Sequence, residues 1–319
     1  MQKNPVRPVV EGGVLTAVAI MFALISTYLP VIGAFVNLLW PVPIVLLGVR
    51  HGYKWSLMAV VASGLIIALI MHPLTAVSVV VGFGLIGIAL GYGLRQGFSP
   101  TKTLFVGAAA SLVSKIAVLA ISAAVIGFNP LTLQTEGMIK GLETAMDFYR
   151  QMGMNAEDMA RMEATLKPMI ELMKIILPAG FVLAAFVDTF LNYQVAKAVL
   201  ARLGQTLEPF PPFRRWNMPR FTVYALAVSF VAIYWGKTRE LEILYNTGMN
   251  IQVVATMLLF IQGMAVVYFL ADKYNLSRIV RGIILFLILS NGIVMQALII
   301  GGAFDIIFDY RQLRTPKRE

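Results

Sequence analysis

The sequence contains no cysteine and only two histidines among its 319 residues. Without cysteine the chain forms no disulfide, presents no thiolate nucleophile and holds no Cys-ligated zinc or iron–sulfur cluster. Two histidines also argue against a multi-histidine metal site, so we expect no metal and no cofactor. Charged residues are scarce as well, at 13% of the chain, against about 25% in an ordinary soluble protein. This scarcity excludes a typical water-soluble enzyme.

Apolar residues take the place of the missing charge. Hydrophobic residues make up 59% of the chain and the mean hydropathy is +0.79, which excludes a disordered protein. The net charge is +10. In a membrane protein such an excess reflects basic cytoplasmic loops that face anionic lipid, and not a nucleic-acid partner. The composition therefore predicts an integral protein of the cell membrane, with the lipid bilayer as its first partner.

Apolar stretches of membrane-spanning length recur along the chain, since a helix needs about 20 apolar residues to cross a bilayer. None shows the alternation of β-barrel strands. The predicted fold class is an all-α polytopic membrane protein with eight or nine transmembrane helices, because the second and seventh stretches are short. The nine stretches are Val9–Leu29, Val31–Val49, Trp55–Met71, Leu74–Leu94, Thr103–Gly127, Met169–Leu200, Phe221–Trp235, Ile251–Ala271 and Gly282–Ala303.

Lysine and arginine are concentrated in the loops on one side of these stretches. With a cytoplasmic N-terminus, 14 of them fall in inner loops, whereas the short outer loops hold only Lys237 and Arg239. The positive-inside rule therefore predicts that orientation. Nine crossings would place the basic C-terminal tail outside, so either the tail is an exception or one short stretch does not cross.

Two changes in composition divide the chain. The outer segment 129–168 has apolar residues at helical spacing, and eight of the 17 methionines lie between positions 129 and 174. It predicts two amphipathic helices separated at Gly153, which either rest on the membrane surface or close as a lid over an outward-facing pocket. The Pro-rich segment 204–219 predicts an extended cytoplasmic linker. The linker joins a six-helix core, residues 1–203, to C-terminal membrane helices, residues 220–303, and a basic tail, residues 304–319.

Two charged residues lie inside apolar stretches, where a charge is costly and therefore informative. Lys115 is midway along the fifth stretch and Asp188 midway along the sixth. These helices run in opposite directions, so both residues reach the same depth and are predicted to pair. The pair is either a link between two helices or a contact for a substrate, a proton or an ion. Asn192, four residues after Asp188, shares its helix face.

The second stretch is interrupted by Pro41 and Pro43, next to Asn37 and Trp40. Broken membrane helices often line cavities, although a kinked helix that only packs gives the same pattern. The predicted ligand-binding residues are therefore Asn37, Trp40, Lys115, Asp188 and Asn192. We expect no catalytic residues, because the chain has no P-loop, no H-E-x-x-H motif and no clustered nucleophile and base.

Small residues form a pattern on the first stretch, where Ala19 and Ala23 share one face. Such small-xxx-small faces let helices approach closely. They serve either packing inside the protein or docking to another membrane subunit.

Several stretches together resemble the YybS-like family of uncharacterised bacterial membrane proteins, over almost the whole chain. They are Leu39-Trp-Pro-Val-Pro-Ile44, Val49-Arg-His-Gly52, Leu90-Gly-Tyr-Gly93, Phe260-Ile-Gln-Gly263 and Gly302-Ala-Phe-Asp305 through Arg311. That family is distantly similar to the S components of energy-coupling-factor (ECF) transporters. Those proteins have six helices and bind a vitamin or a metal from outside. They dock through small residues of their first helix onto a transmembrane coupling subunit that carries two ATPases.

The resemblance implies a transport-related protein that binds a small solute in an outward-facing cavity and takes its energy from partner subunits. Ala19 and Ala23 match the docking pattern of that family. The outer insert and the three extra helices depart from it. The alternative is a scaffold or regulatory membrane protein that uses the same fold and transports nothing.

Overall fold

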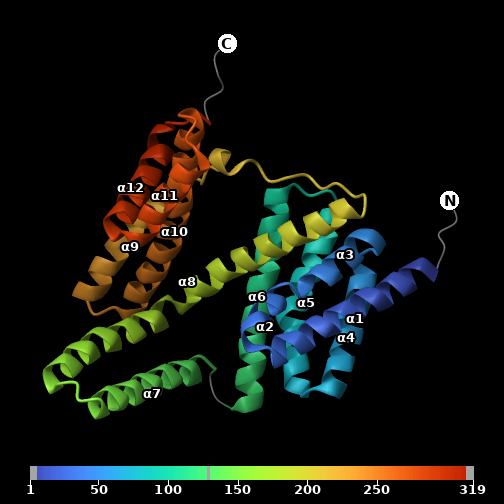
Figure 1. Cartoon of the computed structure of the whole chain (residues 1–319), viewed down its shortest axis with the longest axis horizontal. Helices are drawn as coiled ribbons and strands as arrows, with labels where there is room; N and C mark the ends of the chain where they lie inside the picture. The colour runs from blue at the N-terminus through green and yellow to red at the C-terminus, as the bar shows by residue number, and fades with distance from the viewer. Residues whose placement is uncertain (1–5, 128–129, 314–319) are drawn as a thin grey trace. The chain divides into compact units, whose positions relative to one another are not determined.

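The computed structural model describes residues 6–127 and 130–313, which form helices and connecting turns with no strand among them (Figure 1). They belong to two compact units. Unit 1 lies within residues 1–170 and 180–209, and unit 2 within 171–179 and 210–319. The boundary at Pro209 falls inside the Pro-rich segment, which has only one short 3-10 helix, η1 (Phe213–Arg215).

The all-helical membrane class is confirmed. Within the described residues, seven helices are long and apolar enough to cross a membrane, or eight if one bent pair counts as a single span. The seven are α1 (Val6–Tyr28), α4 (Tyr53–Ile70), α5 (Pro73–Arg95), α6 (Pro100–Ile126), α8 (Ala156–Arg202), α9 (Phe221–Thr238) and α10 (Glu242–Lys273). The exact count of nine is not confirmed. The second stretch forms two short helices that together return the chain to the level of Glu11 near the start of α1, and the ninth stretch is the bent pair.

The second stretch is two short helices, α2 (Pro30–Leu38) and α3 (Pro41–His51). The prolines explain the break, because Pro41 begins α3 and a proline provides no N–H for a continuing helix. Eight consecutive residues of α3, 41–48, are buried. The helix therefore lies in the core of unit 1, where α1, α4 and α5 pack around it.

Glycines allow α3 and α5 to approach closely. A Cβ atom added at Gly48 would lie 3.0 Å from the Cα of Gly91. A larger residue at either position would push the two backbones apart. This contact places Trp40, at the start of α3, in a buried cluster with Ala19, Ala23 and Val79.

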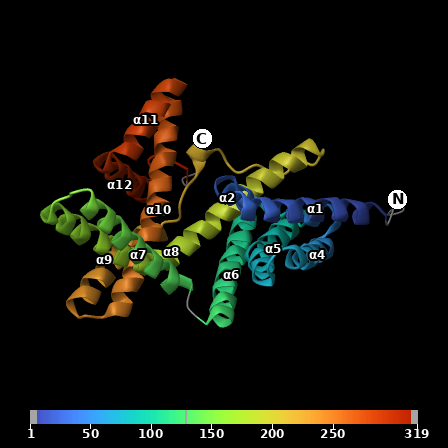
Figure 2. The same cartoon turned by 60° about the horizontal axis from the view of Figure 1, so that its bottom comes forward.

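The predicted outer insert consists of α7 (Pro130–Gln151) and the first turns of α8, which lie side by side in both views (Figures 1 and 2). The chain turns at Gly153, whose φ of +88° favours glycine. The Asn155 side chain then caps α8 by accepting from Asp158 N–H at 2.7 Å. As predicted, the second insert helix continues directly into the sixth span.

Unit 2 contains α9, α10 and a bent pair, α11 (Arg278–Ser290) and α12 (Gly292–Phe308). The helix direction changes by 104° between α11 and α12. The ninth apolar stretch is therefore not one straight helix, and α12 extends past residue 303 to Phe308. Asn291 makes the break by capping α12, since its side chain accepts from the N–H groups of Ile293 and Val294.

The residues of α8 that belong to unit 2 are held by Asn250 of α10. In a regular helix Ala179 N–H would bond to the carbonyl of Ile175. Here Ala179 N–H donates to Asn250 Oδ1 at 2.8 Å, and Asn250 Nδ2 donates to the Ile175 carbonyl at 2.7 Å. The neighbouring Pro178 has no N–H and weakens the helical ladder at this turn, and the Asn250 amide provides hydrogen bonds to two backbone groups there.

Candidate functional site

Lys115 and Asp188 form an ion pair inside unit 1, as their matching depths predicted. Lys115 comes from α6 and Asp188 from α8, and their side chains are 19% and 12% exposed. Ser111 joins the pair, because its hydroxyl accepts from Lys115 Nζ at 3.0 Å and donates to Asp188 Oδ2 at 3.4 Å. The two charges neutralise each other within apolar helices, which removes most of the cost of burying either one alone.

Asn192 extends this polar cluster along α8. Its Nδ2 donates to the carbonyls of Asp188, at 2.8 Å, and Leu38, at 2.9 Å. It therefore connects α8 to the end of α2, where the second span breaks. The backbone of Asn37 lies in α2, but its side chain is outside the described part of the structure, so its predicted role stays a prediction.

Three fully buried polar atoms in the described part of unit 1 have no hydrogen-bond partner. They are Trp40 Nε1, Ser114 Oγ and Asn192 Oδ1. Buried polar groups are nearly always paired, so each such group needs a reason. Asn192 bonds to the Asp188 carbonyl, so its unpaired Oδ1 lies close to a member of the ion pair.

A pocket of about 350 Å³ opens beside Lys115. Its apolar walls come from α5, α6 and α8, and Lys115 is the one charged residue among its described lining residues. The lining consists of Thr75, Ser78, Val79, Gly82, Phe83, Lys115, Val118, Leu119 and Phe181. The pocket is an open depression and not an enclosed cavity. Lys115 thus lines the pocket and pairs with Asp188, whereas Asp188, Trp40 and Asn192 are not part of the lining.

Ala19 and Ala23 are buried within unit 1, with exposures of 0% and 1%. Their methyl groups pack in the cluster around Trp40. Within unit 1 the two alanines therefore contribute to packing. Their role in docking a partner subunit stays a prediction.

Glu11 of α1 is the centre of a second charged cluster. It accepts from Arg7 at 2.9 Å and Arg50 at 3.0 Å, and it lies 2.7 Å from His51 Nε2. Arg50 and His51 end α3, so this cluster ties α1 to α3. Because three basic groups surround one carboxylate, we assign it a role in packing and not in ligand binding.

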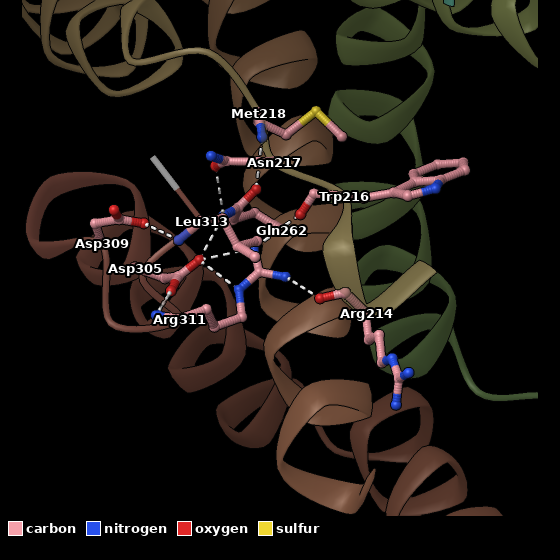
Figure 3. Close-up of polar contacts among 9 residues, drawn as sticks. All are labelled: Arg214, Trp216, Asn217, Met218, Gln262, Asp305, Asp309, Arg311 and Leu313. Atoms are coloured by element: carbon pink, nitrogen blue, oxygen red, sulfur yellow. Dashed lines mark hydrogen bonds and ion pairs between the residues drawn. The ribbon is translucent and has the colours of Figure 1, made fainter. Parts of the chain in front are cut away.

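The sequence analysis missed a buried polar network in unit 2 (Figure 3). Asp305 of α12 pairs with Arg311, with 2.8 Å between Nη2 and Oδ2, and accepts from Gln262 of α10 at 2.5 Å. Arg311 also donates to the carbonyls of Arg214 and Trp216, at 2.6 and 2.8 Å. The network connects α10, α12, the segment after α12 and η1.

A sequence signal for this network does exist. Gln262 and Asp305 are polar residues within apolar runs, and both belong to the stretches that carry the family resemblance. Every bond of the Arg311 guanidinium named above goes to an acceptor inside the protein, which leaves no free face for a ligand. The network is therefore a structural connection and not a binding site. Across residues 6–127 and 130–313, no group of three or more His, Cys, Asp or Glu could hold a metal ion.

The chain was compared with known protein families, curated proteins and solved structures. The family described as "Predicted membrane protein (DUF2232)" matches residues 17–306. A relative from Bacillus subtilis (strain 168), "Uncharacterized protein YybS", is 24% identical over 305 residues, which cover 96% of this chain and 97% of the relative. No solved structure matches the chain.

Proposed function

Because the chain belongs to the DUF2232 family of predicted membrane proteins, we propose that it is a transport-related membrane protein that binds a small solute in the pocket beside Lys115. One observation carries the proposal: an ion pair inside apolar helices has one member, Lys115, on the wall of a pocket. Ionisable residues within membrane segments are costly and typically mark substrate or ion pathways.

The proposed orientation has the N-terminus in the cytoplasm, on the basis of the loop charges. Solute then enters the pocket from outside, and α7 with the first part of α8 lies on the outer side. The chain has no P-loop of its own, so movement of the solute would depend on partner subunits, as in the S components of ECF transporters. That analogy rests on sequence resemblance alone.

The test is whether the purified protein retains a small molecule. Protein extracted in mild detergent is analysed by native mass spectrometry, and its bound contents are released and identified. We expect a small solute in the wild type, its loss from Lys115→Ala, and its retention in Lys140→Ala, a matched change at an exposed lysine of α7. A wild-type protein that carries neither a solute nor an ATPase-bearing partner would contradict the proposal.

A scaffold or regulatory membrane protein is the second candidate, and one observation favours it. The small residues expected to dock a coupling subunit, Ala19 and Ala23, are buried in unit 1. A scaffold needs no such docking, and in that case Lys115 and Asp188 only join α6 to α8. It would co-purify with no solute, and Lys115→Ala would change its stability alone.

A further inference from the structure

The chemistry around the pocket narrows the class of solute. Apolar side chains from three helices, among them Phe83, Val118 and Phe181, form most of the wall. The Ser78 hydroxyl is already used, since it donates to the Leu74 carbonyl at 2.9 Å. Lys115 therefore provides the one charged contact, and a matching solute has a mainly apolar body and one anionic group.

The charge balance of the site adds a second condition. Lys115 and Asp188 together are neutral, so an anion placed beside them would leave one negative charge uncompensated within apolar helices. Such a charge is strongly disfavoured there. Protonation of Asp188 restores neutrality, because Lys115 can then pair with the anion of the solute. One proton taken up at Asp188 with the solute would supply this compensation.

The neighbours of Asp188 allow this exchange. Its described polar contacts are Lys115 and Ser111 from α6, and its own backbone carbonyl is bonded to Asn192 of α8. Lys115 is the one charged group among them. The Ser111 hydroxyl now donates to Asp188 and accepts from Lys115, and by rotating it can accept from a protonated Asp188. The carboxylic acid would thus keep a hydrogen-bond partner when Lys115 turns to the solute.

We propose that the pocket binds a small amphipathic monocarboxylate together with one proton, with Lys115 contacting the carboxylate and Asp188 accepting the proton. This inference rests on the proposed function, since it assumes that the pocket is a solute site. No covalent bond changes. Lys115 exchanges one carboxylate partner for another, and the proton comes from the surrounding water.

Isothermal titration calorimetry on the detergent-purified full chain tests the inference. The probes are hexanoate and its uncharged and cationic counterparts, hexanamide and hexylammonium. Hexanoate should bind about tenfold or more tightly than either, the difference made by one charge-assisted hydrogen bond. Titrations in two buffers of different ionisation enthalpy should show uptake of about one proton, and affinity should fall with rising pH toward a limit of about tenfold per unit.

Two variants separate this inference from simpler ones. Asp188→Asn imitates the protonated carboxyl, so it should keep hexanoate binding while losing both the proton uptake and the pH dependence. Lys115→Met should lose the preference for hexanoate, whereas Lys140→Met should behave as the wild type. Proton uptake that persists in a folded Asp188→Asn protein would mean that neutral hexanoic acid binds, and would overturn the role of Asp188.

Two other results of the titrations would overturn the inference. Tighter binding of hexanamide or hexylammonium would overturn the monocarboxylate class while leaving the solute pocket intact. If folded wild-type protein binds none of the three probes, the inference fails, and the solute retained on purification still tests the proposed function independently.

Discussion

Lys115 and Asp188 depend on each other energetically. The free energy of a buried pair is a small difference between the desolvation of two charges and their attraction. Removal of one member leaves the other charge without its partner in apolar surroundings, whereas removal of both takes the desolvation cost away as well. The two residues should therefore be strongly non-additive in stability.

A double-mutant cycle measures this coupling. Lys115→Ala or Asp188→Ala should each lower the free energy of unfolding by about 3 kcal/mol, and the double variant should lose less than the sum of the two. Unfolding in detergent, followed by heat or denaturant, gives the three values. Additive losses would show that the pair contributes nothing as a pair.

The ion pair was predictable from sequence because both charges interrupt long apolar runs on consecutive antiparallel spans. The pocket beside it was not, since its lining residues, such as Val79 and Phe181, belong to the ordinary apolar content of three helices. Two partners of Arg311 were equally hidden, because that residue lies beyond the last helix and these two acceptors are the backbone carbonyls of Arg214 and Trp216, in and just after η1. Every residue type has a backbone carbonyl, so such an acceptor cannot be recognised from the sequence.

At the scale of elements, α1 has one face directed into unit 1 and another directed away from it. Ala23 is buried in the cluster around Trp40, whereas Ala17 is exposed on the same helix. A leucine has three more carbon atoms than an alanine, and a close-packed core has no space for them. The same substitution at the two positions therefore distinguishes a role of Ala23 in internal packing from a role in docking a partner subunit.

Ala23→Leu should lower the stability of the isolated protein by about 1–3 kcal/mol through overpacking, and Ala17→Leu should leave it nearly unchanged. Thermal unfolding of each purified variant provides the comparison. If Ala23→Leu keeps the wild-type stability but loses an ATPase-bearing partner on purification, then Ala23 serves docking after all.

The hydrogen bonds of Asn250 to α8 lead to another prediction. Asn250→Leu removes the amide that satisfies Ala179 N–H and the Ile175 carbonyl, and each buried unpaired group costs about 1–3 kcal/mol. Pro178→Ala should let α8 close its regular ladder, so that Ala179 N–H bonds directly to Ile175. The double variant should therefore be more stable than Asn250→Leu alone in detergent unfolding. No rescue by Pro178→Ala would contradict this account.

For the whole molecule, the length of the apolar runs was enough to predict the helical class and seven long spans, because a helix needs a long apolar run to cross a bilayer. It could not show where a run bends. The apolar sequence continues through residues 282–303, and the 104° bend depends on a single capping residue, Asn291. The break between α2 and α3 was easier to predict, because Pro41 and Pro43 interrupt that apolar run.

The bend bears directly on the conflict between the basic tail and the positive-inside rule. In unit 2, Asp272 at the end of α10 pairs with Arg214 of η1 and with Arg281 near the start of α11. The end of α12 returns to the same place, because Arg311 bonds to η1 and Lys273 Nζ lies 6.0 Å from the ring of Tyr310. The α11–α12 pair therefore begins and ends at one end of unit 2.

The last prediction follows from this geometry and from the proposed orientation. If α11 and α12 do not cross together, the C-terminal tail lies on the same side as the linker, and the positive-inside rule holds for both. The chain has no cysteine, so single cysteines can be introduced and tested with a membrane-impermeant thiol reagent. Glu143→Cys should react in intact cells, whereas Arg95→Cys, Arg215→Cys and Gln312→Cys should react only after the cells are permeabilised. A cysteine at position 312 that reacts from outside while position 215 stays protected would mean that the bent pair crosses the membrane, and labelling of position 95 from outside would reverse the proposed orientation.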